Sequence, residues 1–270
     1  SLRRQRQMCI RDRYSDGALL AAHADLEDAE QTVYIPEIHT TAKDQTTKIN
    51  HTEATKNATI VDTVFYTHLL PGREYTVTGT LMDQATNKPI LVNGKEVTAE
   101  TTFTAEKSEG SVDVIFTFDA SALKGKSVVA FEELSVNGEF CAEHKDKDDE
   151  NQTVTFPGIQ TTARDNVTED HVSNATDSIT IVDTVAYTGL KKGDTYTVTG
   201  TLMDAETGEA ALDDDGNAIT ASKEFTAPTA DGNIDITFTF AGVSLAGKTL
   251  VAFEQIDHDG KKYAVHADIN

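Results

Sequence analysis

The chain repeats itself, and this internal repeat limits the folds it can adopt. The run YTVTGTLMD occupies residues 75–83 and returns unchanged at 196–204, an offset of 121 residues. A unit of this length has the size of one ordinary domain. The other matches are IHTTAKD at 38–44 with IQTTARD at 159–165, TIVDTVFYTHL at 59–69 with TIVDTVAYTGL at 180–190, and VAFEEL at 129–134 with VAFEQI at 251–256. We therefore predict tandem copies of one domain.

Both ends of the sequence carry incomplete copies of the unit. AAHADLEDAEQTV at 21–33 matches AEHKDKDDENQTV at 142–154, so a piece of a third copy precedes the first complete one. The second copy ends at VHADIN, residues 265–270, four residues before the Gln expected from the first copy. The predicted organisation is a non-native, adapter-like segment at 1–13, the C-terminal tail of a preceding repeat at 14–35, a complete repeat 1 at 36–156, and repeat 2 at 157–270, truncated before its last strand. We interpret the chain as an excerpt from a longer array.

The charge excludes several classes of function. Acidic residues number 45 and basic residues 23, which gives a formal net charge of −22. Binding to nucleic acids or to anionic membranes needs the opposite sign, so we expect neither. Residues 1–13 are the exception, with five arginines. They resemble translated sequencing-adapter read-through, and a basic targeting arm is the alternative.

Cysteine usage and hydropathy exclude two further classes. The only cysteines, Cys9 and Cys141, are too few for a disulfide scaffold or a multi-cysteine metal site. No apolar run approaches the ~20 residues that span a bilayer, so we expect no membrane insertion in this segment.

The residue pattern within each copy is typical of strands. Polar and apolar residues alternate over 75–82, 112–118 and 234–240, and 128–134 is a short apolar run. Turn signals separate these segments, among them Asn93-Gly94 and Asp259-Gly260. About seven short strands in each copy predict an all-β fold, with tandem Ig-like antiparallel β-sandwich domains in an elongated array.

Polar residues recur at matching places inside these apolar segments. Repeat 1 has Thr40, Asp62, Glu132, His144 and Gln152, and repeat 2 has the counterparts Thr161, Asp183, Glu254 and His266. Alternation puts Thr40 on the same strand face as Ile38 and Ala42, which favours it over its neighbour Thr41. Each residue taken alone is commonly structural, and a recent duplication would also copy neutral residues.

Four motifs in combination, VDTVFY, TVTGTLMD, VAFE and HKDKDDENQT, resemble the VaFE-repeat family, also described as T-Q ester-bond domains. The resemblance covers nearly all of residues 17–270. Such domains occur in cell-wall-anchored surface proteins and adhesins of Gram-positive bacteria. The resemblance therefore implies an extracellular structural stalk, with neighbouring repeats of the same protein as partners and host surface ligands bound through other domains.

The resemblance also implies a covalent cross-link inside each domain. In repeat 1 an ester would join Thr40, as the nucleophile, to Gln152, as the acyl donor, with loss of ammonia. His144 would accept the hydroxyl proton and pass it to the ammonia. Asp62 and Glu132 would orient the His or polarise the amide, and these two roles stay unassigned. This is a single self-modification and not enzymatic turnover, and it implies no cofactor or metal.

Two departures from the family pattern concern the ends of the chain. Repeat 2 lacks its Gln, so at most one intramolecular ester is expected. His23 and Gln31 belong to the tail of a preceding repeat whose Thr is absent. The matching pieces suggest that residues ~20–35 of one molecule complete repeat 2 of another by strand addition.

Three alternatives to the cross-linked stalk remain open. An adhesive module that binds host protein or glycan directly would expose an aromatic or apolar patch. A hydrolase would need an open pocket around Thr40. A Lys–Asn isopeptide bond would replace the ester in an otherwise similar stalk.

Overall fold

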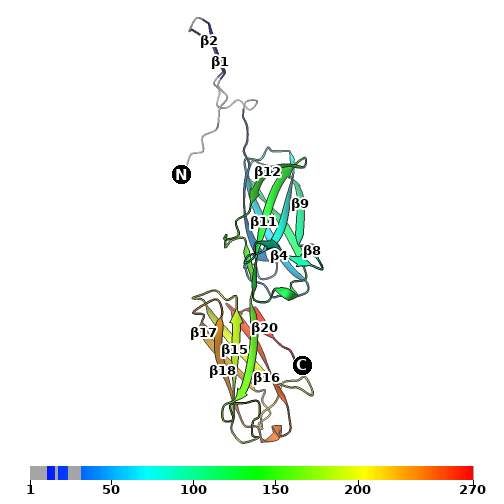
Figure 1. Ribbon diagram of the computed structural model, residues 1–270, viewed down its shortest axis with the longest axis vertical. Helices are drawn as coiled ribbons and strands as arrows, with labels where there is room; N and C mark the ends of the chain where they lie inside the picture. Colours follow the sequence, from blue (N-terminus) through cyan, green and yellow to red (C-terminus); the bar gives the residue numbers. More distant parts are fainter. Residues whose placement is uncertain (1–10, 16–17, 24–31, 270) are drawn as a thin grey trace.

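Two β-sandwiches stacked end to end make up the body of the protein (Figure 1). The computed structural model describes residues 11–15, 18–23 and 32–269. All pairs of named strands in these ranges are antiparallel, which confirms the predicted tandem antiparallel sandwich fold. No helix among the described residues is long and apolar enough to cross a membrane.

Repeat 1 is built from two facing sheets. One sheet has the order β10-β4-β3, and in the other β11 pairs with β5, β12 and β13, while β9 and β6 also pair with β5. Its elements are β3 (Glu37–Asp44), β4 (Ala58–Thr67), β5 (Glu74–Asp83), β6 (Lys88–Pro89), β7 (Leu91–Val92), β8 (Lys95–Glu96), β9 (Thr98–Thr104), β10 (Gly110–Phe118), the short helix η2 (Ser121–Leu123), β11 (Lys126–Val136), β12 (Glu139–His144) and β13 (Thr153–Phe156).

Repeat 2 has the same layers in the orders β14-β15-β18 and β17-β16-β19-β20. Its elements are β14 (Gly158–Asp165), β15 (Ile179–Thr188), β16 (Thr195–Asp204), β17 (Thr220–Thr226), β18 (Gly232–Phe240), the short helix η3 (Val243–Leu245), β19 (Leu250–His258) and β20 (Lys261–His266). Ahead of both sandwiches, β1 (Arg11–Ser15) and β2 (Ala18–His23) form a separate hairpin, which includes residues 11–13 of the adapter-like segment.

Alternation in the sequence decides which side chains form the two cores. Strand β4 is buried at every second residue over its whole length, and β5 follows the same period. Repeat 1 encloses its own core around Ile60, Leu81 and Phe116. Repeat 2 encloses another around Val198 and Phe238. Each sandwich therefore buries its apolar surface internally.

The edge of β11 carries two strands in succession. Residues 132–136 of β11 pair with β12, and residues 126–129 pair with β13. The chain leaves this edge after His144 and returns at Gln152, whose carbonyl accepts a hydrogen bond from the Ala130 amide at 3.1 Å. The break in the ladder lies beside Glu132, so polar side chains can enter the space between the sheets there.

A small set of direct contacts forms the joint between the two sandwiches. The ring of His51 stacks on Tyr263 with centroids 4.8 Å apart. Lys262 Nζ lies 2.9 Å from Glu53 Oε2, and Lys261 Nζ donates to the Thr47 carbonyl at 2.7 Å. Gly125 has φ +75°, and a Cβ there would lie 2.6 Å from Thr188 Oγ1, because the Thr188 side chain packs directly against the glycine.

Acid is expected to loosen this joint. Burial, with His258 and Lys191 nearby, lowers the pKa of His51 to about 4, against a weaker opposing effect of Asp194. In the open joint the pKa of His51 would be near 6.5, so the open form binds a proton more readily than the closed form. The closed joint therefore loses stability as the pH drops from about 6.5 towards 4. Fluorescence transfer between dyes on the two repeats should therefore decrease between pH 7 and pH 4.5. His51→Phe keeps the stacking and should abolish the response.

The exposed His39 provides the matched control, because it stacks on Phe65 away from the joint. His39→Phe should leave the acid response unchanged. An equal acid response in the protein carrying His51→Phe would contradict this account of the joint.

Candidate functional site

Four polar side chains from four places in repeat 1 meet between its sheets. Thr40 comes from β3 and Asp62 from β4 in one sheet, while Glu132 comes from β11 and Gln152 from the turn before β13 in the other. Thr40 is 2% exposed and the other three are 0% exposed. Thr41, the other candidate nucleophile, is only half-buried, because adjacent strand residues point to opposite faces.

Hydrogen bonds join Thr40, Glu132 and Gln152 into one cluster. Gln152 Nε2 donates to Thr40 Oγ1 at 2.9 Å and to Glu132 Oε2 at 2.8 Å. Thr40 Oγ1 donates to the same Glu132 oxygen at 3.3 Å. One carboxyl oxygen therefore contacts both the hydroxyl and the amide nitrogen. The two side chains that it bridges are 112 residues apart in the sequence.

The two buried carboxyl groups influence each other's protonation. Burial and the neighbouring Asp62 raise the pKa of Glu132 well above its usual value. Burial also raises the pKa of Asp62, although Glu132, Thr40 and His144 oppose the shift. Two carboxylates this close in a dry site do not both ionise at neutral pH, so the pair retains one proton, which the two carboxyl groups share.

His144 reaches the same region from β12. It is the register partner of Glu132, and its Nε2 lies 3.3 Å from Asp149 Oδ2. Asp149 also shapes the turn that carries Gln152, because its carbonyl accepts the Gln152 amide at 3.2 Å and its Oδ1 accepts the Asn151 amide at 2.8 Å. Asp149 therefore contacts the His ring through its carboxylate and holds Gln152 through its backbone carbonyl.

Asp149 is the functional candidate that sequence reasoning missed. It lies in the acidic run 146–150, which as a pattern predicts only a solvated turn. The sequence does contain one indication that Asp149 belongs to the repeated pattern. The partial copy at 21–33 also has an Asp, Asp28, five residues after its His. Asp146 has the same kind of counterpart in Asp25, so the sequence did not distinguish the two.

Unsatisfied polar atoms are concentrated at this site and at its copy in repeat 2. Buried polar atoms in folded proteins nearly always have hydrogen-bond partners, so such a concentration marks a candidate functional site. Within the described part of the chain, every buried side-chain oxygen or nitrogen without a hydrogen bond belongs to Asp62, Glu132, His144, Gln152, Asp183, Glu254 or His266.

Repeat 2 assembles the same residues without a Gln. Asp183 and Glu254 are fully buried, and His266 Nδ1 lies 3.7 Å from Glu254 Oε2. Burial and Asp183 raise the pKa of Glu254 to about 9. Thr161 is only half-buried, unlike its counterpart Thr40, which Gln152 covers in repeat 1.

One of the two tail residues named in the sequence analysis lies among the described residues. His23 belongs to β2 and is paired with Arg11. Gln31 lies outside the described residues.

Comparison with known proteins gives one strong match and several weak ones. The family model of the T-Q ester bond containing domain matches residues 36–156 and 157–270. No curated protein matches the sequence.

The solved structures resemble the chain only distantly. An adhesin from Mobiluncus mulieris with intramolecular disulfide, isopeptide and ester bond cross-links, in space group P1, is 15% identical with a TM-score of 0.38, over 83% of this chain and 80% of that one. The structure of the same adhesin in space group P21 is 16% identical with a TM-score of 0.37, over 83% of this chain and 80% of that one. Red sea bream transglutaminase is 12% identical with a TM-score of 0.26, over 88% of this chain and 31% of that one.

The family match rests on the sequence of both sandwiches and covers most of the 270 residues. The chain belongs to the family of T-Q ester bond containing domains and holds two copies of that domain.

Proposed function

We propose that repeat 1 closes an ester bond between Thr40 and Gln152 and serves as a cross-linked segment of a bacterial surface stalk. One observation carries this proposal: the amide nitrogen of Gln152 lies 2.9 Å from the Thr40 hydroxyl, and both contact one oxygen of Glu132 in a buried site. Folding thereby supplies the high local concentration that an alcohol needs to attack an amide.

The contacts support a balanced reaction through Glu132. Thr40 Oγ forms a bond to the side-chain carbonyl carbon of Gln152, and the bond from that carbon to Nε2 breaks. The hydroxyl proton passes to Glu132 Oε2 and from there to the departing nitrogen, which leaves as ammonia. When Asp62 holds the shared proton, Glu132 is a carboxylate whose raised pKa makes it a stronger base than an exposed one, and its Oε2 contacts both Thr40 Oγ1 and Gln152 Nε2.

Asp62 and His144 adjust the charge of Glu132, and Asp62 also interacts with the Thr40 hydroxyl. Asp62 shares the proton of the acidic pair and keeps the pKa of Glu132 high. His144, held by Asp149 through Nε2, places a basic ring beside the pair. We assign it a positioning and charge-balancing role, which differs from the direct proton transfer that the resemblance implies.

The buried site favours one self-modification over turnover. A hydrolase must admit an external substrate to its nucleophile, whereas Thr40 is 2% exposed and covered by Gln152. The ester, once formed, consumes both side chains. The proposed activity is therefore a single closure in each molecule.

A mechanical role follows from where the bond lies. Thr40 is on β3, which begins repeat 1, and Gln152 precedes β13, which ends it and leads into β14 of the next repeat. Tension along the chain would thus pass from β3 to β13 through a covalent bond. Together with the family's occurrence in wall-anchored surface proteins, this supports a load-bearing extracellular stalk, with adjacent repeats as its partners.

Intact mass of the denatured protein tests the ester directly. We expect the wild type to weigh one ammonia less than its sequence, and Gln152→Ala and Thr40→Val to show their full sequence masses. Fragmentation should recover one branched peptide that contains Thr40 and Gln152.

Repeat 2 supplies the matched control. Thr161→Val makes the same change where no Gln contacts the Thr, so this variant should still lose one ammonia. A wild-type mass equal to the sequence mass after long incubation would refute the proposed ester.

A further inference from the structure

Residues 45–53 of repeat 1 form a loop that contacts repeat 2 at several points of the joint. The Thr47 carbonyl and the Glu53 carboxylate accept the ammonium groups of two lysines of repeat 2. The His51 ring stacks on an aromatic ring of repeat 2, and Ile49 packs against the hydrophobic core of that repeat. We call residues 45–53 the joint loop.

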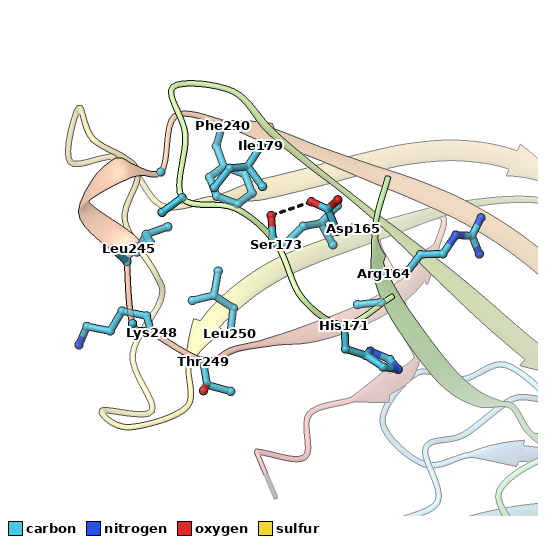
Figure 2. A pocket seen from close by; sticks show the side chains of 16 residues that line it. Arg164, Asp165, His171, Ser173, Ile179, Phe240, Leu245, Lys248, Thr249 and Leu250 are labelled. Atoms are coloured by element: carbon cyan, nitrogen blue, oxygen red, sulfur yellow. Dashed lines mark hydrogen bonds between the residues drawn. The ribbon is translucent and has the colours of Figure 1, made fainter. Parts of the chain in front are cut away.

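Local hydrogen bonds to Asp44 set the shape of the joint loop. Asp44 is 8% exposed, its Oδ1 accepts the Thr47 amide at 2.7 Å, and its Oδ2 accepts the Thr52 hydroxyl at 2.6 Å. Repeat 2 has the same arrangement, since Asp165 accepts the Ser173 hydroxyl at 2.6 Å (Figure 2). The joint loop therefore moves as one unit, and its position depends on the surface against which it rests.

That surface is strand β13. The Thr155 amide donates to the Asn50 carbonyl at 3.0 Å, and the Thr52 amide donates to the Thr155 carbonyl at 3.0 Å, so the two segments pair in parallel around His51. The Thr155 side chain also packs against repeat 2, where a Cβ on Gly189 would lie 2.9 Å from Thr155 Cγ2. Strand β13 therefore both supports the joint loop and contacts repeat 2 directly.

Strand β13 is short for an element in this position. It has four residues, Thr153–Phe156, and it pairs with residues 126–129 of β11. Burial of Val154 and Phe156 holds it in place. A strand of this length at an edge still opens locally at a lower free-energy cost than the central strands do. An open β13 leaves the joint loop without its support, so the joint has a docked state and an undocked state.

The proposed ester ends at the first residue before this strand. It would join Gln152, which directly precedes β13, to Thr40 on β3, the strand that continues through Asp44 into the joint loop. The bond would thus tie the start of β13 to the strand that carries the joint loop. A cross-link acts by restricting the open state, so it lowers the population of molecules in which β13 is undocked.

We propose that closure of the ester in repeat 1 locks the joint, so that the cross-link also fixes the direction in which repeat 2 is held. This inference rests on the proposed function. The coupling passes from Gln152 through β13 and the joint loop to repeat 2, and the docked and undocked states of β13 are what both sites influence. Tension along the chain would preserve the coupling, because a β-strand is already extended and lengthens little under load.

The distance between two spin labels, one in each repeat, tests the coupling in the full chain. The labels replace Glu100 on β9 and Glu224 on β17, which are exposed residues in the middle of strands, after Cys9 and Cys141 have been changed to Ser. Pulsed electron spin resonance then gives the distribution of distances. We expect a narrow distribution in molecules whose mass shows the loss of one ammonia.

Two variants prevent closure by different means. Thr40→Val removes the nucleophile, and Glu132→Gln removes the base while it keeps the shape of the side chain. Both should broaden the distribution of distances. Both should also speed hydrogen exchange of the Thr52 and Thr155 amides, which connect the joint loop to β13, by at least about tenfold. Thr161→Val is the matched control and should keep the narrow distribution and the slow exchange.

The possible outcomes separate the coupling from the ester itself. Distributions as narrow in Thr40→Val and Glu132→Gln as in a wild type that has lost its ammonia would overturn the coupling and leave the proposed function standing. A wild type that keeps its full sequence mass would overturn both. Equal acceleration of exchange at the Gly72 amide, which bonds to the Ala105 carbonyl at the opposite end of repeat 1, would mean that the variants loosen the whole domain, and would also overturn the coupling.

Discussion

Stretched between its two ends, a single molecule is expected to release the length of repeat 2 but not the length stored in repeat 1. An ester from Thr40 to Gln152 would bypass the 112-residue separation between them. At roughly 3.4 Å per extended residue, the ester would prevent about 380 Å of chain from extending. Force spectroscopy should show this length as an additional unfolding step only when the ester is absent, as in Gln152→Ala.

Repeat 2 serves as the internal reference in the same pulling experiment. Its site has no Gln partner within the sequence, so it should unfold in the wild type and in the variant alike. Thr161→Val should leave both steps unchanged. Full extension of repeat 1 in wild-type molecules whose mass shows the ammonia loss would contradict the proposed load path.

Loss of the ester should also lower the thermal stability of repeat 1 strongly. In the loop-entropy model, by analogy with a disulfide, closing a loop of ~100 residues contributes about 4.7 kcal/mol. At about 4 °C per kcal/mol for a domain of this size, Thr40→Val should lower the Tm of repeat 1 by about 20 °C. Scanning calorimetry should resolve this as a shift of one of two transitions.

Thr40→Val disturbs the packing of repeat 1 little, because Val has nearly the same shape as Thr and carries a methyl group in place of the hydroxyl. Thr161→Val makes the identical change in repeat 2, where it should shift the second transition by no more than a few degrees. Equal small shifts in both repeats would mean that Thr40 contributes a hydrogen bond and not a cross-link.

The fold could be predicted because its determinants are local and repeated. Alternating residues in segments such as 75–82 specify strands with one inward face, and a 121-residue period specifies domain copies. The same alternation put Thr40 on the inward face, and in the structure it is buried while Thr41 is not. Period and alternation are properties of consecutive residues, so the sequence alone determines them.

Which side chains meet across the two sheets was decided only by the tertiary structure. No local pattern shows that one oxygen of Glu132 would contact both Thr40 and Gln152, because these residues come from separate strands. Asp149 became a partner of His144 only when the turn before β13 folded back. Contacts through space depend on register and packing, which one sequence does not specify.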